Sequence, residues 1–251
     1  MTVHRKIAGR SCNLAGRTIQ VWAVVTEAPD SIVAELEELL SPDEKIRASR
    51  FRFDRHRRSF VIARGTLRIL LGRYLDRAPA GIQFECGAKG KPAVAPRNEL
   101  EFNVSHSGGL ATFAFTLGCQ IGIDLEKIRP LPDMEPIARR FFNTDEAAEI
   151  MSLHPKERDR AFFLCWTRKE AYIKATGDGL SAPLDDFRVT LRPCELPRFV
   201  HISHDEAAAG AWTLHDLQFA PDYAGALAYR GSERDLSVMP ILDPAEYAAH
   251  R

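Results

Sequence analysis

A helix-start pattern occurs twice in this chain and limits the folds that it can adopt. Residues 41–44 read SPDE and residues 143–146 read NTDE, so Ser41 and Asn143 are candidate N-cap residues followed three positions later by glutamate. An arginine and then a phenylalanine follow each cap at the same spacing, with an offset of 102 residues between the copies. If this shared register records a duplication, two similar lobes pack about a pseudo-twofold axis, with residues 118–130 crossing between them. In such a fold we expect the ligand-binding site at the interface between the two lobes.

Hydrophobic periodicity predicts that helices alternate with hairpin-like strands, which is an α+β pattern. Helices are expected at residues 31–40, 42–50, 55–75, 133–140, 144–152 and 157–175. Strands are expected at residues 18–25, 100–107, 110–117, 120–126, 186–191, 211–219 and 223–230.

The composition excludes several classes of protein. Lys and Arg together number 34, as do Asp and Glu, so the whole chain has no bias toward nucleic acid or an anionic membrane. Five scattered cysteines without a C-x-x-C pair argue against a disulfide framework and a thiolate zinc site. The N-terminus lacks an apolar signal segment, and no run approaches the roughly 20 apolar residues of a membrane span. We therefore expect a soluble cytoplasmic protein.

Two carboxylates stand two residues apart in the segment IGIDLE. Asp124 and Glu126 lie on a predicted strand, so their side chains point to the same face. Their mutual repulsion would be relieved by Mg²⁺, which favours carboxylate, water and phosphate oxygens. The alternative is a strand edge on which one carboxylate pairs with Lys127 or Arg129.

The segment WTRKEAYIKATGDGL combines charged and bulky residues on one predicted helix. Glu170 and Lys174 are four residues apart and share a face, with Lys169 adjacent. The simplest interpretation is a salt bridge on the helix surface, which contributes only about 0.2–0.5 kcal/mol. Stability alone therefore gives little reason for this pattern.

The segment FNVSHSGG ends a predicted strand with hydroxyl and imidazole groups that suit phosphate binding. Ser105 and His106 point to opposite faces because they are neighbours in a strand, so they cannot form a nucleophile–base pair. The chain also lacks the G-x-S-x-G nucleophile elbow. A Ser-His hydrolase is therefore disfavoured.

Basic residues concentrate in two segments of this neutral chain, which suggests an anionic ligand. Residues 47–68 contain Arg47, Arg50, Arg52, Arg55, Arg57, Arg58, Arg64 and Arg68 against one acid, Asp54. The glycine-rich segment 87–94 adds Lys89 and Lys91 before Pro92, without a Walker motif. The H-x-x-H spacing at 201–204 lacks a third metal ligand and is better explained by surface histidines.

The order of four motifs resembles the 4′-phosphopantetheinyl transferases, specifically the two-lobed Sfp-like class. The motifs are Gly90-Lys91-Pro92, Phe102-Asn103-Val104-Ser105-His106-Ser107, Gly122-Ile123-Asp124-Leu125-Glu126, and Trp166 with Lys169, Glu170 and Lys174. The resemblance covers roughly residues 20–230 and implies the fold of that family, a pseudo-dimer of two similar α+β lobes. It places the N-terminal lobe at 1–120, the C-terminal lobe at 121–232 and a tail without motifs at 233–251.

The resemblance also implies an activity, which is the transfer of 4′-phosphopantetheine from coenzyme A to a serine of an apo acyl or peptidyl carrier protein, with release of adenosine 3′,5′-bisphosphate. Asp124, Glu126 and Glu170 would hold Mg²⁺, or Mn²⁺ in its place. Glu170 would also act as the base, and Lys174, supported by Lys169, would stabilise charge on the pyrophosphate. Coenzyme A contacts are expected from Arg47, Arg58, Lys91, Pro92, Ser105, His106, Lys169 and Lys174. We expect a monomer, because a fused pair of lobes already supplies the interface.

One departure concerns the arginine-rich segment. Glu44 takes a place where relatives often carry a basic residue directed at the 3′-phosphate, while Arg47 keeps the next such place. Arg50 or Arg58 can supply the positive charge that is missing at position 44.

Two other functions remain open at this stage. A Mg²⁺-dependent phosphohydrolase or nuclease could use the D-x-E pair on a nucleotide-like substrate, although the neutral charge disfavours polymeric nucleic acid. A non-catalytic module that binds coenzyme A or a carrier would be expected to lose a metal ligand, and this chain keeps all three carboxylates.

Overall fold

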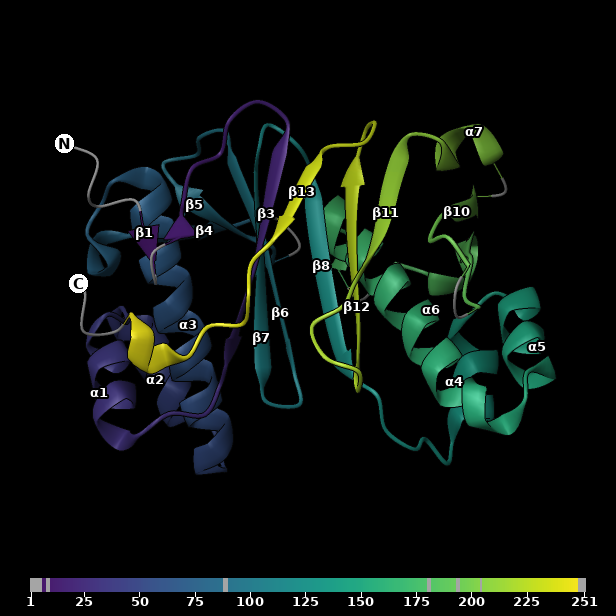
Figure 1. The fold of residues 1–251 in the computed structure, drawn as a ribbon, viewed down its shortest axis with the longest axis horizontal. Helices are drawn as coiled ribbons and strands as arrows, with labels where there is room; N and C mark the ends of the chain where they lie inside the picture. The colour runs from purple at the N-terminus through teal and green to yellow at the C-terminus, as the bar shows by residue number, and fades with distance from the viewer. Residues whose placement is uncertain are drawn as a thin grey trace.

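Two α+β lobes lie side by side, with their sheets in the middle of the molecule and their long helices on the outer sides (Figure 1). The computed structural model describes residues 6–7, 10–87, 90–179, 182–192, 195–203 and 205–247. A short antiparallel pair, β1 (Lys6–Ile7) and β2 (Arg10–Ser11), precedes the first lobe. In the described ranges no helix has the length and apolar character that a membrane span requires.

The two lobes repeat one order of elements. The N-terminal lobe contains β3 (Thr18–Val25), α1 (Asp30–Glu38), α2 (Pro42–Ser49), α3 (Asp54–Leu75), β4 (Gln83–Cys86), β5 (Pro92–Ala95), β6 (Leu100–Ser107) and β7 (Leu110–Leu117). The C-terminal lobe contains β8 (Ile121–Lys127), α4 (Met134–Phe141), α5 (Thr144–Ser152), α6 (Pro155–Thr176), β9 (Phe187–Val189), β10 (Phe199–Ile202), β11 (Trp212–Leu217) and β12 (Tyr223–Arg230). A short helix, α7 (Glu206–Ala209), is added between β10 and β11.

Sheet topology confirms the pseudo-dimer. In the N-terminal lobe β7 pairs antiparallel with both β3 and β6, and in the C-terminal lobe β12 pairs antiparallel with both β8 and β11. The long helices α3 and α6 have 22 residues each and both end in a left-handed residue, Asp76 and Gly177. They start 101 residues apart, so the offset of 102 holds for α2 and α5 but not for the long helices. Four residues separate α2 from α3 but only two separate α5 from α6, and α5 is one residue longer than α2.

The capping boxes predicted at Ser41 and Asn143 are both formed. Their glutamates are buried and serve a second purpose. Glu44 accepts hydrogen bonds from Arg64 and Arg68 of α3, and Glu146 forms a buried salt bridge with Lys169 of α6. In each lobe, therefore, a buried ion pair ties the capped short helix to the long one.

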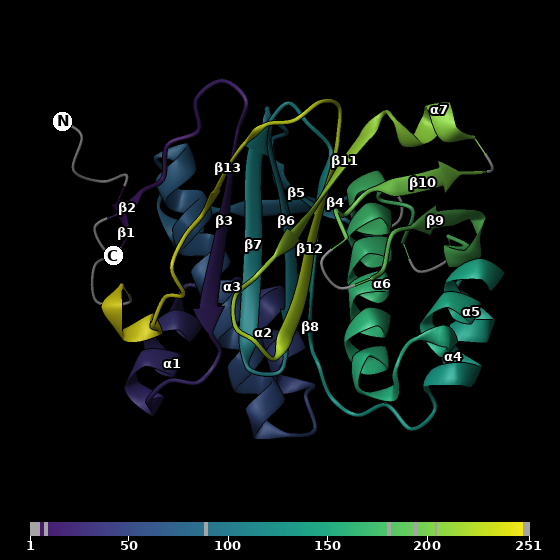
Figure 2. The same ribbon diagram turned by 45° about the vertical axis from the view of Figure 1, so that its right-hand side comes forward.

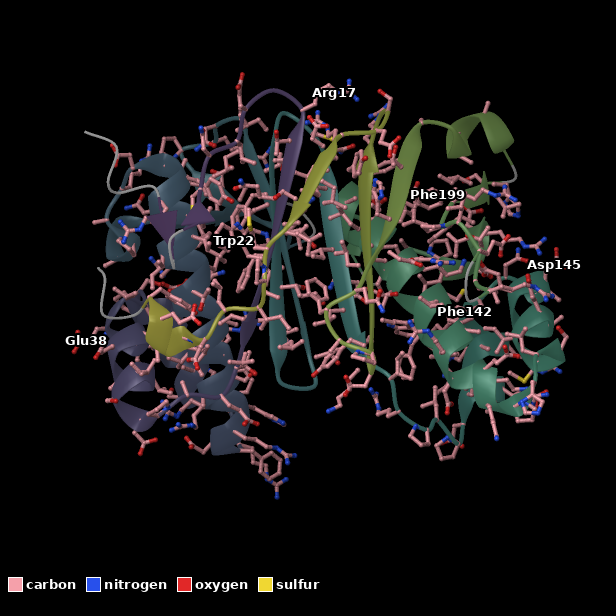
Figure 3. All side chains as sticks on the ribbon, viewed as in Figure 1. Arg17, Trp22, Glu38, Phe142, Asp145 and Phe199 are labelled. Atoms are coloured by element: carbon pink, nitrogen blue, oxygen red, sulfur yellow. The ribbon has the colours of Figure 1, made fainter. Side chains whose placement is uncertain are left out.

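Separate apolar cores fill the two lobes. Trp22 lies inside the N-terminal lobe and Phe142 and Phe199 lie inside the C-terminal lobe, whereas Glu38 and Asp145 lie at the outer margins (Figure 3). A third apolar cluster joins the lobes. It contains Ile19, Val21, Ala114, Cys119, Ile121, Ile123, Leu217, Leu227 and Tyr229.

After β12 the chain returns to the N-terminal lobe, in the segment where the sequence offers no motif. Strand β13 (Asp235–Val238) pairs in parallel with β3, and Figure 2 shows the two strands alongside each other. Further along, the buried Tyr247 shares a hydrogen bond of 2.5 Å with Thr66 of α3. Residues 235–247 therefore complete the sheet and core of the N-terminal lobe.

Several strands differ from the sequence expectation. The strands β1, β2, β4, β5, β10 and β13 were not predicted, and the strand expected at 186–191 is limited to β9, Phe187–Val189. Of the segment 87–94, expected as a glycine-rich turn, residues 92–94 instead belong to β5, which pairs antiparallel with β4. Lys89 of this segment lies outside the described residues. His204 of the H-x-x-H segment also lies outside them.

Candidate active site

Strand β8 and helix α6 approach each other closely at Gly122. A Cβ atom added there would lie 2.1 Å from the carbonyl oxygen of Ala171 and 2.4 Å from the amide nitrogen of Ala175. Both of these are backbone atoms of α6, which cannot move aside as a flexible side chain would. The glycine therefore lets the helix rest directly on the strand.

This contact brings together a lysine, an aspartate and a serine from three elements. Lys174 Nζ lies 2.7 Å from Asp124 Oδ1 and donates to Ser105 Oγ at 3.1 Å. Ser105 also donates to Asp124 Oδ1, at 2.8 Å. Ser105 comes from the N-terminal lobe, so the group spans the lobe boundary. Among the described residues Lys174 makes its salt bridge to Asp124, and the expected helix-surface salt bridge to Glu170 is not formed.

Negative charge accumulates around this group. Burial raises the pKa of Glu170, and the nearby Asp124 raises it further. Burial also raises the pKa of Glu126, with Asp124 again adding to the rise, although a hydrogen bond from Ser107 opposes it. Repulsion among three such carboxylates would be relieved by a cation.

The donor set fits Mg²⁺ in chemistry and charge. Asp124 Oδ2 is buried and has no hydrogen-bond partner, and the neighbouring donors Glu126 and Glu170 are carboxylates, the ligand type that Mg²⁺ favours. The three carboxylates do not converge as a set of metal ligands in this structure. In the described ranges, no group of three or more His, Cys, Asp or Glu side chains has the arrangement to hold a metal ion.

The open edge of β8 is covered by polar side chains of the N-terminal lobe. The backbone N–H groups of Ile123, Leu125 and Lys127 donate to side chains of Asn103, Ser105 and Ser107 respectively. Sequence reasoning assigned no role to Asn103. The spacing N-x-S-x-S places the three side chains on one face of β6, and that alternation is the signal that could have identified them.

Lys91 also joins the lobes, at the start of β8. Its Nζ donates to the carbonyl oxygens of Ile121 at 2.9 Å and Ala175 at 3.1 Å, and burial lowers its pKa. Lys91 and Pro92 line a cleft together with residues from the end of α6, among them Gly177. Two segments far apart in the sequence thus line one cleft.

Lys169 does not join this group. Its side chain is fully buried, and Nζ lies 2.8 Å from Glu146 Oε2 and donates to the backbone carbonyl oxygens of Leu184 and Phe187. The ammonium is therefore engaged inside the C-terminal lobe, away from Lys174, and cannot reach a ligand in this arrangement. This placement argues against the expected contact of Lys169 with coenzyme A.

The other predicted ligand contacts lie on the N-terminal lobe without joining the group around Asp124. Arg58 donates to Asp30 at 2.5 Å and to the carbonyl oxygen of Ala28 at 2.6 Å, and the Arg47 guanidinium lies over the ring of Phe60. His106 is exposed, on the face of β6 opposite Ser105.

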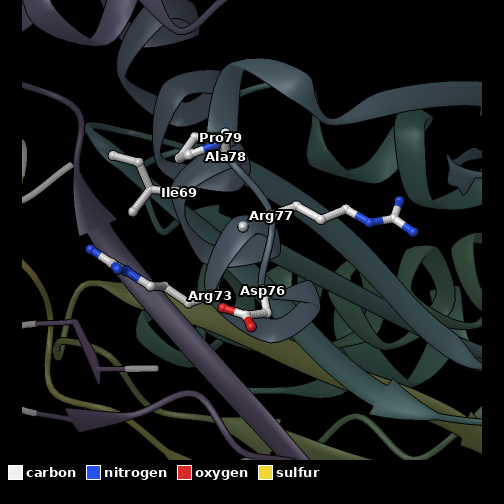
Figure 4. Close-up of a pocket in the computed structure, with 7 residues that line it drawn as sticks. Ile69, Arg73, Asp76, Arg77, Ala78 and Pro79 are labelled. Carbon is white, nitrogen blue, oxygen red and sulfur yellow. The ribbon is translucent and has the colours of Figure 1, made fainter. Parts of the chain in front are cut away.

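A separate hollow lies at the C-terminal end of α3 (Figure 4). It is lined by residues of the segment 69–79, and Figure 4 shows Arg73 and Arg77 extending in different directions around Asp76. None of the residues that meet at β8 and α6 lines it, so we do not assign it to the active site.

Comparison with known proteins identifies families and relatives that the chain resembles. The family model for the 4′-phosphopantetheinyl transferase superfamily matches residues 120–228, and the model for the N-terminal part of 4′-phosphopantetheinyl transferases matches residues 28–117. The 4′-phosphopantetheinyl transferase HetI of Nostoc sp. is 41% identical over 207 residues, which cover 81% of this chain and 83% of that protein. A 4′-phosphopantetheinyl transferase of Bacillus subtilis is 36% identical over 176 residues, 69% of this chain and 77% of that protein.

Proposed function

Because the chain belongs to the 4′-phosphopantetheinyl transferase superfamily, we propose that it transfers 4′-phosphopantetheine from coenzyme A to a serine of an apo acyl or peptidyl carrier protein, in a Mg²⁺-dependent reaction. The observation that best supports the proposal is the contact of Lys174 and Asp124 with Ser105, which assembles one polar site from both lobes. A site with this composition suits phosphoryl transfer, which depends on positioning and neutralisation of charge.

Asp124, Glu126 and Glu170 are the residues that would hold the metal. Mg²⁺ bound there would neutralise the pyrophosphate and act as a Lewis acid on its oxygens. The unpartnered Asp124 Oδ2 and the raised pKa values of Glu126 and Glu170, caused first by burial, support this assignment.

Glu170 is the proposed base. Because burial raises its pKa, its carboxylate is a stronger proton acceptor than an exposed glutamate. The carrier serine oxygen forms a bond to the phosphorus that bears pantetheine, and the bond from that phosphorus to adenosine 3′,5′-bisphosphate breaks. The serine proton passes to Glu170, and Lys174 stabilises the negative charge on the leaving phosphate.

The N-terminal lobe supplies the proposed contacts to the adenosine end of coenzyme A. Lys91 and Pro92 line the cleft between the lobes, and Ser105 and His106 come from β6 at the same boundary. Arg47 and Arg58 are proposed for the 3′-phosphate. This division assigns coenzyme A contacts to residues 1–120 and the metal and catalytic residues to 121–232.

We further propose a monomer in the cytoplasm as the working form. The two fused lobes already form the interface that surrounds the site. Three cysteines, Cys12, Cys119 and Cys165, are buried as free thiols, which suits a reducing compartment.

The dependence of product release on the carrier tests the proposal. With coenzyme A and Mg²⁺, the protein should release adenosine 3′,5′-bisphosphate only when an apo carrier protein is added, because transfer needs the serine. Chromatography measures the released product. Release at the same rate without a carrier would instead identify a Mg²⁺-dependent phosphohydrolase of a nucleotide-like substrate.

A further inference from the structure

Two sheet edges meet where the lobes join. Strand β6 is the last strand of the N-terminal sheet and β8 is the last strand of the C-terminal sheet. The two strands lie next to each other without forming a backbone ladder, so the outward N–H groups of β8 need other partners.

Side chains of the N-terminal lobe replace the missing ladder. Residues 121, 123, 125 and 127 of β8 present their backbone groups to this edge, and each is bound by a side chain from β6 or by Lys91. The bond from Ile123 N–H to Asn103 Oδ1 is 2.9 Å long, and Asn103 is buried. We call this row of four contacts the interlobe seam.

Asn103 differs from the two serines of the seam. Ser105 and Ser107 accept from the backbone of β8 and also donate to the carboxylates of Asp124 and Glu126. The side-chain oxygen of Asn103 accepts from the Ile123 N–H, which belongs to the peptide between Gly122 and Ile123, one residue before Asp124. Gly122 lies against α6, so this peptide is held by the helix on one side and by Asn103 at the edge.

We propose that Asn103 is a positioning residue for the transfer reaction, which fixes the peptide before Asp124 so that the Asp124 carboxylate stays with Ser105 and Lys174. The inference rests on the proposed function, because positioning matters only if Asp124 serves the reaction. Asn103 itself touches neither Asp124 nor Lys174 by a hydrogen bond, and it acts through the backbone of β8.

Three substitutions separate the acceptor from the shape of the side chain. Asn103→Leu keeps the approximate shape and removes the acceptor, whereas Asn103→Asp keeps an acceptor oxygen in place. Asn103→Ser is a smaller change, because it keeps an acceptor on a shorter side chain. This variant replaces Asn103→Leu in the experiment if the leucine variant does not fold. Tyr247→Phe is the matched control, because it removes a different buried hydrogen bond, to Thr66, in the core of the N-terminal lobe.

The experiment measures steady-state transfer to an apo carrier and amide hydrogen exchange at Ile123 by NMR. Asn103→Leu should lower kcat by about 10- to 100-fold and change KM for coenzyme A much less, because a small misplacement affects the transition state most. The Ile123 amide should exchange faster in this variant and not in Tyr247→Phe. Asn103→Asp should restore much of kcat and the protection of Ile123, and Asn103→Ser should lie between the two.

Two results have different meanings. If wild-type protein transfers but Asn103→Leu, or Asn103→Ser in its place, has normal kcat or unchanged Ile123 exchange, the inference is overturned and the proposed function stands. If wild-type protein modifies no carrier, the proposed function fails and the positioning role fails with it.

Discussion

Lys174 and Asp124 form a salt bridge of 2.7 Å between helix α6 and strand β8, and both side chains also bind Ser105 of the other lobe. An i,i+4 pair on the helix surface would have left Lys174 with Glu170. Instead the lysine crosses to the strand, and Glu170 stays buried with a raised pKa, caused first by burial and then by Asp124. The helix thus presents a cation and a carboxylate separately to one site.

The close approach at Gly122 predicts a strong effect of a single methyl group. Gly122→Ala should lower the free energy of unfolding by roughly 1–3 kcal/mol, because the new Cβ meets the backbone of Ala171 and Ala175. Urea denaturation checks this. Gly81→Ala is the matched control, since nothing lies within 4 Å of a Cβ at that position. Equal stability of Gly122→Ala and wild type would contradict the described contact.

Lys169 should behave as a structural residue. Lys169→Met leaves Glu146 buried without its cation, so the free energy of unfolding should fall by about 3–5 kcal/mol, measured by chemical denaturation. The exposed Lys156 of the same helix is the control, and Lys156→Met should change stability by less than about 0.5 kcal/mol.

The double variant distinguishes this role of Lys169 from a ligand contact. Adding Glu146→Met to Lys169→Met removes the stranded carboxylate and should recover part of the lost stability. An unchanged loss in the double variant would argue against the buried pair as the cause.

The raised pKa of Glu170 predicts a pH-dependent effect on stability. Because burial and the charge of Asp124 raise the folded-state pKa above the ordinary 4.5, the folded chain binds this proton more tightly than the unfolded chain. The stabilisation from protonation is present below pH 4.5 and is lost as the pH rises through the folded pKa. Glu170→Gln should therefore raise Tm at about pH 8. The gain in Tm should shrink as the pH falls toward the pKa of the carboxyl group in the unfolded chain. A lower Tm of the variant at about pH 8 would contradict this.

Metal addition should act through the same carboxylates. Mg²⁺ that binds the folded chain should raise the Tm of wild-type protein by mass action, with a concentration dependence that reports its affinity. Asp124→Asn should reduce that increase, and EDTA should abolish it. The same increase in wild type and variant would place the metal elsewhere.

The sequence predicts the site's main elements because their patterns are local. Alternation along a strand puts Asp124 and Glu126 on one face, and the capping boxes at Ser41 and Asn143 reveal the duplicated helices. Each of these inferences needs only a few neighbouring residues.

Other features depend on contacts that a local pattern does not carry. Helix α6 is buried on more than one side, so its sequence does not tell which charged residue faces the site, and it does not reveal that Lys169 pairs with Glu146. The parallel pairing of β13 with β3 joins residues more than 200 positions apart, and no motif in either strand predicts this pairing. The pairing of Glu44 with Arg64 and Arg68 likewise appears only once α2 rests on α3.

The most direct test of the site weighs an intact apo carrier protein after incubation with coenzyme A, Mg²⁺ and enzyme. With wild-type enzyme the carrier should gain the mass of one phosphopantetheine. With Asp124→Ala or Glu170→Gln it should gain none, while circular dichroism shows the fold unchanged. Near-normal transfer by either variant would contradict the assignment of these carboxylates to the reaction.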